Sequence, residues 1–179
     1  MRESVSSPAL LIGEDMLHIV TDIQGIQYGQ IMDLYAQDLL EAANKSYGDL
    51  LVNEGLFNAE QDFYAFLRDV FFQTPGAFFA LWLEDGIYCA GLRMEPWEDG
   101  MLLCGIITRE DRRRKGYAQK LLNKVLAQTA PVPVYSHVEK GNLASIALHE
   151  KCGFTLAGES AQMLDGSLLH NFCTFTYGK

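Results

Sequence analysis

Residues 106–118 read IITREDRRRKGYA and run from an apolar strand pattern, through a charged turn, into an amphipathic helix pattern. Successive backbone N–H groups at a helix start, with the positive end of the helix dipole, favour a bound phosphate or pyrophosphate. Gly116 and Ala118 keep large side chains away from such a group, and the arginines add positive charge. The alternative is a solvated basic turn. Neither the G-x-x-x-x-G-K-S/T phosphate loop nor the G-x-G-x-x-G dinucleotide fingerprint is present.

Residues 138–154 read VEKGNLASIALHEKCGF and predict a second passage from a strand into a helix. At 100° per residue, Asn142, Ser145 and His149 fall on one edge of that helix. Each has an ordinary explanation: an N-cap for Asn142, a first-turn polar residue for Ser145, and a surface position for His149. Three polar side chains on one edge, after a phosphate-type turn, favour a shared functional role.

Hydrophobic periodicity places the other elements around these two stretches. Aspartate-glycine pairs at 85–86 and 99–100 indicate hairpin turns, and Asn58 with Gln61 resembles a helix capping box. The expected helices cover about 27–44, 59–73, 117–128 and 143–151, and the expected strands cover 17–21, 77–83, 87–95, 101–108, 132–138, 155–163 and 169–177. These elements predict a mixed α/β sheet with helices on both faces, in a single domain of residues 1–179.

Charge is unevenly distributed along the sequence. The formal net charge is −9, but residues 1–100 hold 4 basic and 17 acidic side chains, and residues 101–179 hold 10 basic and 6 acidic ones. This overall acidity argues against a nucleic-acid partner, because Lys and Arg supply most of that affinity. The first part of the chain is therefore suited to a cationic or amine-bearing partner, and the second part carries one localised basic turn.

Cysteine usage and hydropathy suggest a compartment. The four cysteines form no C-x-x-C pair, so we expect free, mostly buried thiols in a reducing environment. The apolar run at 9–12 is too short for the core of a signal peptide, and no apolar run approaches the length of a membrane span. We therefore expect a cytoplasmic protein without a membrane partner. The four histidines have no metal-ligand spacing, and no metal is expected.

Two motifs resemble those of a known family. The stretch RRKGYA at 113–118 resembles the Q/R-x-x-G-x-G/A pyrophosphate motif of the GNAT superfamily of acyl-CoA-dependent N-acetyltransferases. The stretch NLAS at 142–145, followed by Gly-Phe at 153–154, resembles the second motif of that family. The resemblance covers about residues 101–154, which it implies to be the acetyl-CoA-binding core. It implies a GNAT-like, mostly antiparallel sheet with one splayed parallel pair.

The resemblance also implies how acetyl-CoA, as co-substrate, is held. The pantetheine arm would lie like an extra strand in a gap between the strands at 101–108 and 132–138, and the pyrophosphate would lie on the turn before the helix. The implied cofactor-binding residues are Ile106, Thr108, Arg113, Arg114, Lys115, Gly116, Tyr117, Ala118, Asn142 and Ser145.

Catalytic groups are less clearly indicated. In the resembled family the acid that protonates the departing thiolate is frequently a tyrosine, at the position that His149 occupies here, so the resemblance implies His149 as the acid. The strand at 101–108 carries no carboxylate that could act as a base. Candidates for the base are Glu95, Glu98 and His137, and an ordered water is the alternative.

The leading hypothesis is therefore an N-acetyltransferase that moves an acetyl group from acetyl-CoA to a primary amine of a small molecule or peptide by direct attack. The alternative is an acyl-CoA-binding sensor without turnover. By the resemblance, the helices over about 27–73 form the acceptor side. A homodimer through the two C-terminal strands is expected only by analogy.

Overall fold

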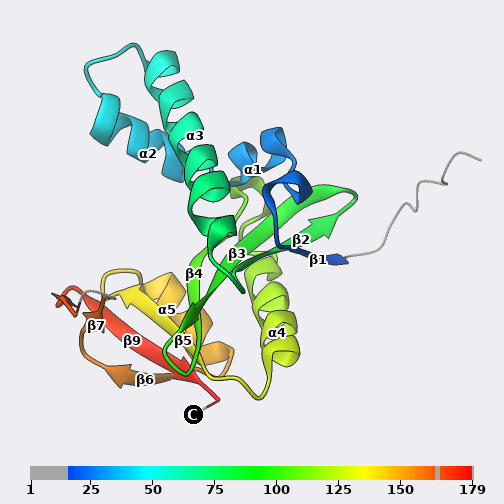
Figure 1. The fold of residues 1–179 in the computed structure, drawn as a ribbon, viewed down its shortest axis with the longest axis vertical. Coiled ribbons are helices and arrows are strands. Elements are labelled where there is room, and N and C mark those ends of the chain that lie inside the picture. Colours follow the sequence, from blue (N-terminus) through cyan, green and yellow to red (C-terminus); the bar gives the residue numbers. More distant parts are fainter. Residues whose placement is uncertain (1–15, 164–165, 179) are drawn as a thin grey trace, which may run out of the picture.

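A computed structural model of the chain describes residues 16–163 and 166–178. Its main sheet is mixed and mostly antiparallel, with the strand order β1-β2-β3-β4-β5-β9-β6; within the residues described, β4 and β5 are the one parallel pair. The strands are β1 (Met16–Val20), β2 (Phe78–Glu84), β3 (Ile87–Trp97), β4 (Gly100–Thr108), β5 (Val134–Glu139), β6 (Thr155–Gly158) and β9 (Phe172–Tyr177). The predicted fold class is confirmed (Figure 1).

Helices cover both faces of this sheet because β2 is buried on both sides. Phe79 and Leu81 belong to one apolar core, and Ala80 and Trp82, which alternate with them, belong to the other. The first core packs against α1 (Tyr28–Leu34), α2 (Ala36–Tyr47) and α3 (Val52–Asp69), and the second packs against α4 (Tyr117–Thr129) and α5 (Leu143–Lys151). Short 3₁₀ turns lie at Ile23–Gly25, Phe71–Gln73 and Glu110–Arg112.

The parallel pair separates after a short contact, and this separation positions the site. Residues Met101–Leu103 pair with Val134–Ser136, and the pairing ends there, although both strands continue. On its other edge, β4 contains a bulge opposite Leu92 of β3, because the register shifts between Gly91 and Arg93. Gly105 lies in this bulge with φ +56°, a left-handed conformation that favours glycine. The second half of β4 therefore has one unpaired edge.

The N-terminal helices differ from their predicted bounds. The helix expected over 27–44 is broken at Tyr35, which separates α1 from α2. The helix expected over 59–73 begins at Val52, so Asn58 lies in the helix interior and the predicted capping box is wrong. The sequence does not predict the start of α3 because Leu51 and Val52 are exposed and do not continue the apolar stripe.

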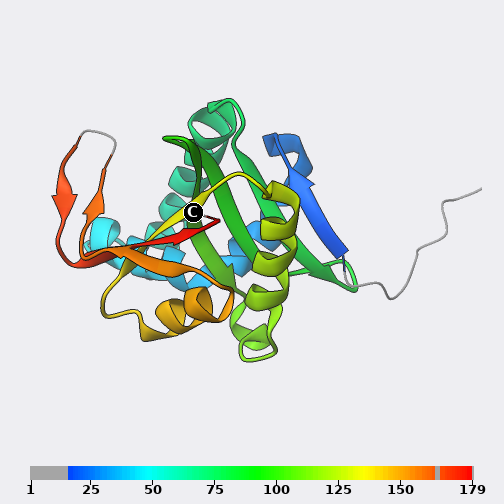
Figure 2. The same cartoon turned by 90° about the horizontal axis from the view of Figure 1, so that it is seen from below.

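The C-terminal strands are also shorter than expected. The strand predicted over 155–163 divides into β6 and β7 (Ala161–Gln162), and the one over 169–177 divides into β8 (Leu168–Leu169) and β9. The pair β7–β8 forms a separate small hairpin that projects beyond the main sheet (Figure 2). The apolar run at 9–12 lies outside the described residues.

The turn between β3 and β4 is displaced by one residue from its predicted position. Trp97 pairs with Gly100, so the loop is Glu98–Asp99, with Glu98 at φ +46°. Gly100 is instead required by a close approach, because a Cβ there would lie 2.2 Å from the carbonyl oxygen of Pro133. The other predicted turn, Asp85–Gly86, is confirmed, and both its residues have positive φ.

Candidate active site

A cavity of about 640 Å³ lies between the end of β4, the turn before α4, and the first turns of α5; we call it the cofactor cavity. Nine of the ten residues predicted to bind the cofactor line it: Ile106, Thr108, Arg113, Arg114, Gly116, Tyr117, Ala118, Asn142 and Ser145. The tenth, Lys115, is exposed and does not line it. Two motifs that lie far apart in the sequence thus meet around one cavity.

The turn before α4 offers unpaired donors to this cavity. Gly116 is the N-cap residue with φ +82°, and no side chain caps the helix. Arg114 also has a positive φ, of +60°. A Cβ at Gly116 would meet no atom of the described residues within 4 Å. The left-handed backbone conformation, and not a lack of space, therefore favours glycine at this position. Because the first backbone N–H groups of a helix lack partners within the helix, they are available to an anionic group here.

The basic run divides into structural and cavity-lining members. Arg112 donates to Glu84 at 2.9 Å, and the Tyr117 hydroxyl donates to the same carboxylate at 2.5 Å. Arg109 is paired with Asp33 and Asp111. Arg113 donates to Gln37 at 2.8 Å and is exposed at the cavity with Arg114. The solvated-turn alternative therefore fails for Arg112, whose guanidinium anchors the turn to β2.

The side chain of Tyr117 is fixed by burial and by its hydrogen bond to Glu84. Its ring is buried, and the hydrogen bond to Glu84, with some burial, raises the pKa of its hydroxyl to about 12. The hydroxyl thus remains a neutral donor that is already engaged with Glu84.

A second cavity of about 500 Å³ occupies the gap between β4 and β5; we call it the splay cavity. Ile106, Asn142 and Ser145 line both cavities, so the two adjoin at these residues. The side chain of Asn142 accepts from the backbone N–H of Ser145 at 3.0 Å, which confirms the expected N-cap of α5. Both predicted histidines line the splay cavity.

His149 is buried, with 1% of its surface exposed, so the alternative explanation of a surface position is wrong. Its Nδ1 lies 2.7 Å from the carbonyl oxygen of Ser145, which can only accept, so Nδ1 carries a proton. Its Nε2 lies 2.9 Å from the hydroxyl of Ser136. Burial lowers the pKa of His149, and the ring also packs on Phe154 and Phe175. The neutral ring therefore accepts the Ser136 hydrogen at Nε2.

His137 has a different environment. Its Nδ1 lies 3.1 Å from the hydroxyl oxygen of Thr174, and that hydroxyl donates to the carbonyl of Ser160 at 3.0 Å. Nδ1 must then be the donor to Thr174, which leaves Nε2 of the neutral ring with a lone pair. This Nε2 is buried without a hydrogen-bond partner among the described residues. Burial lowers the pKa of His137, although Glu98 and the Gln162 backbone act in the opposite direction.

The two predicted carboxylate bases are less favourably placed. Glu95 lies in β3 opposite Leu102, and it lines none of the cavities described here. Glu98 lies in the exposed β3–β4 turn. Of the three candidates, only His137 reaches the splay cavity.

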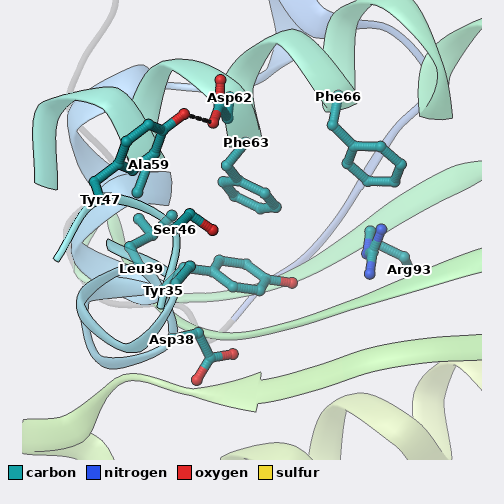
Figure 3. Close-up of a pocket in the computed structure, with 11 residues that line it drawn as sticks. Tyr35, Asp38, Leu39, Ser46, Tyr47, Ala59, Asp62, Phe63, Phe66 and Arg93 are labelled. Carbon is teal, nitrogen blue, oxygen red and sulfur yellow. Dashed lines mark hydrogen bonds between the residues drawn. The ribbon is translucent and has the colours of Figure 1, made fainter. Parts of the chain in front are cut away.

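A third cavity of about 390 Å³ lies between α2, α3 and the sheet; we call it the helical pocket (Figure 3). Its walls are mostly apolar, and Asp38 lines both this pocket and the cofactor cavity. The Tyr35 hydroxyl donates to the carbonyl oxygen of Gly105 at 3.2 Å and so ties the pocket to the bulge of β4. Burial raises the pKa of Tyr35 to about 12.

Among the cavity residues that sequence reasoning missed are Asp38, Arg93, Ser136 and Gly105. Their positions depend on strand register and on the gap between β4 and β5, neither of which a local pattern reveals. The presence of Gly105 within an otherwise apolar strand was the one available signal, because an isolated glycine in a strand often marks a bulge.

All four cysteines are free, and three of them are buried. Within residues 16–163 and 166–178, no cluster of three potential metal ligands occurs. In the same part of the chain, no helix combines the length and hydrophobicity needed to cross a bilayer.

Comparison with known proteins identifies similar sequences. An uncharacterised N-acetyltransferase of Bacillus subtilis, YjdG, is 38% identical over 76 residues, which is 40% of this chain and 45% of the relative. The alignment therefore spans less than half the length of that relative.

Solved structures of low sequence identity share the fold. A putative acetyltransferase, YncA, from Salmonella typhimurium with acetyl-CoA has a TM-score of 0.58 at 18% identity, over 92% of this chain and 93% of that one. The PaiA N-acetyltransferase of Thermoplasma acidophilum, in complex with coenzyme A, also has a TM-score of 0.58, at 10% identity, over 90% and 98%. The ribosomal-protein-S18-alanine N-acetyltransferase of Escherichia coli has a TM-score of 0.54 at 17% identity, over 90% and 92%.

The family model supplies the assignment. It matches residues 31–154, a segment that includes the splayed strands, the turn before α4, and α5. This segment also contains both motifs that line the cofactor cavity. The chain belongs to the GNAT family of acetyltransferases.

Proposed function

We propose that this protein transfers an acetyl group from acetyl-CoA to a primary amine of a small molecule or peptide, by direct attack of the amine on the thioester. The observation that carries the proposal is that the cofactor and splay cavities adjoin at three shared lining residues, Ile106, Asn142 and Ser145. A ligand that extends from the start of α4 into the gap between β4 and β5 would fit this groove.

The residues present fit the chemistry of CoA. The unpaired N–H groups at the start of α4, with Arg113 and Arg114 beside them, suit a pyrophosphate. The free edge of β4 at Ile106 and Thr108 suits the amide groups of a pantetheine arm, because an extended chain can pair there as a strand would. When bound, acetyl-CoA supplies the activated acetyl group, and unpaired N–H groups of β4 would be donors to its carbonyl oxygen.

His137 is the proposed base. Its lone pair at Nε2 is directed by the bond from Nδ1 to Thr174, and its lowered pKa keeps the ring neutral at neutral pH. A neutral imidazole can accept the proton that the attacking amine loses. Glu95 and an ordered water are the alternatives.

His149 remains the proposed acid, by the resemblance, and its contacts add a condition. Burial lowers the pKa of His149, and Nε2 of the resulting neutral ring accepts from Ser136, so the resting ring has no proton to give at that end. The ring would first have to take up a proton at Nε2 from solvent and form the imidazolium. That proton would pass to the thiolate through the Ser136 hydroxyl, which is bonded to Nε2 and, like His149, lines the splay cavity. We therefore propose that His149 and Ser136 act as a pair on the departing thiolate.

We assign these roles to one domain, residues 1–179. The helices within about 27–73 form the acceptor side, and about 101–154 form the acetyl-CoA-binding core. The helical pocket between α2 and α3 supports this division, because Tyr35 and Asp38 connect it to the core.

The test is release of free CoA from acetyl-CoA in the presence of an amine panel, with CoA binding measured in parallel by calorimetry. We expect acceptor-dependent CoA release and mass-spectrometric detection of the acetylated amine. Tight CoA binding without turnover on any acceptor would instead favour the sensor hypothesis. Absence of CoA binding would contradict both.

A further inference from the structure

The helical pocket contains a cation that lacks an anionic partner. Of the described residues that line the pocket, Arg93 is the basic one, and Asp38 and Asp62 are acidic. Arg93 forms no ion pair within the described part of the chain, whereas Arg68, Arg109 and Arg112 all do. Figure 3 shows Arg93 at one end of the pocket and Tyr47 at the other, with Asp62 on the Tyr47 side.

The surroundings of Arg93 make this lack of a partner costly. Its guanidinium carbon lies 5.1 Å from the ring centre of Phe66 and 5.7 Å from that of Phe71. Its Nε is buried without a hydrogen-bond partner in the described residues. Stacking on rings offsets part of the lost hydration, but a buried N–H without an acceptor still costs free energy. The Tyr35 hydroxyl also interacts with this guanidinium. A bound anion in the pocket would supply the opposite charge that the guanidinium lacks among the described residues.

This guanidinium lies beside the proposed reaction centre. A Cβ on Gly105 would be only 3.0 Å from Nη2 and 3.3 Å from Nε of Arg93, so the guanidinium packs directly against the bulge of β4. Gly105 also lines the splay cavity and accepts the hydrogen bond from Tyr35. An anion on Arg93 would therefore lie next to the strand where the thioester is expected.

We infer that the acceptor carries a carboxylate adjacent to its amine, as a free α-amino acid does, and that Arg93 binds this carboxylate. The inference rests on the proposed function and names its substrate class. A carboxylate on Arg93 leaves the α-amine within one carbon of it, close to β4, where the amine can attack.

The remainder of the pocket fits the other groups of such an acceptor. Leu39, Phe63 and Phe66 offer an apolar wall to a side chain of medium or aromatic size. Asp38, where the pocket meets the cofactor cavity, provides negative charge near an incoming ammonium group. The acidic N-terminal half thus contains a site for both charges of a zwitterion, not only for a cation.

The experiment compares phenylalanine, leucine and methionine with the amide and the decarboxylated amine of each, as acceptors for acetyl-CoA. A carboxylate that binds Arg93 through charge-assisted hydrogen bonds should raise kcat/KM about tenfold to a hundredfold over the matched amide. Most of the difference is expected in KM. In Arg93→Met the ratio of kcat/KM for the acid to kcat/KM for the matched amide should fall toward one. In Arg93→Lys part of this ratio should be restored.

The control removes a cation elsewhere. Arg68→Met deletes an exposed arginine of α3 that pairs with Asp69, and it should leave the ratio of acid to amide unchanged. If the amides and amines are acetylated as well as the acids, or if Arg93→Met lowers all acceptors equally, the inference is overturned while the proposed function stands.

A binding measurement covers the case of no turnover on these acceptors. Calorimetric titration of the same amino acids onto the CoA complex should then show binding that Arg93→Met abolishes. Absence of such binding overturns the inference, whereas absence of acetyl-CoA binding contradicts the proposed function itself.

Discussion

Substitution of Gly116 by alanine isolates the contribution of the turn before α4 to cofactor binding. Gly116 has φ +82°, and a Cβ there would meet no atom of the described residues within 4 Å. The cost to folding is therefore conformational only, about 1–2 kcal/mol for an L-residue in the left-handed region. For a chain of this length that corresponds to a fall in Tm of about 2–8 °C.

Binding should suffer an additional loss. The new methyl group would lie at the N-cap of α4, where the proposed pyrophosphate approaches the backbone N–H groups. A charge-assisted hydrogen bond is worth about 1.5–3 kcal/mol, so losing one should weaken CoA binding about tenfold to a hundredfold. Calorimetric titration with CoA measures this, and thermal unfolding measures the cost to folding.

Gly86→Ala is the matched control. Gly86 has φ +75° and equally open space at its Cβ, but it lies in the β2–β3 turn and lines none of the three cavities. It should lose the same stability as Gly116→Ala and keep the affinity for CoA of the unmodified protein. Equal CoA affinities in the two variants would refute the placement of the pyrophosphate.

Three other substitutions test the catalytic groups and the sheet. Because burial lowers the pKa of His137, the base should stay neutral down to and below pH 6.5, and kcat/KM should fall only on further acidification. The variant His137→Asn should lose this acidic limb of the pH–rate profile. An unchanged limb in that variant would exclude His137 as the base. His149→Phe and Ser136→Ala should each lower kcat at least tenfold and retain the affinity for CoA. A kcat of His149→Phe within twofold of that of the original protein would remove His149 from the mechanism. Gly100→Ala should lower the free energy of unfolding by about 1–3 kcal/mol, because its Cβ would overlap the Pro133 carbonyl, and denaturant unfolding that matches the original protein would contradict this contact.

The parts of the fold that local chemistry determines were predictable from the sequence. The β2–β3 turn needs positive φ at both of its residues, which Asp85 and Gly86 provide. The phosphate-type turn and the α5 edge were identified because their motifs are short and contiguous. Their meeting around one cavity followed from the family resemblance, and the structure places both on its walls.

The remaining features depend on contacts between distant segments. The break at Tyr35 accompanies a hydrogen bond to Gly105, 70 residues further along the chain. Burial of His149 depends on Ser136 of β5 and on the aromatic rings around it. Arg93 has no sequence signal at all, because a lone arginine in a strand becomes informative only when its neighbours are known. Tertiary position, and not residue type, defines these groups.

Amide hydrogen exchange with and without CoA tests the central claim most directly. The proposed groove predicts that CoA slows exchange at Ile106 and Thr108 of β4, and at the N–H groups of residues 114–118. Amides of the β2–β3 turn should exchange at the same rate in both states. Saturating CoA that leaves residues 106–118 exchanging as in the free protein would contradict the placement of the cofactor and the mechanism built on it.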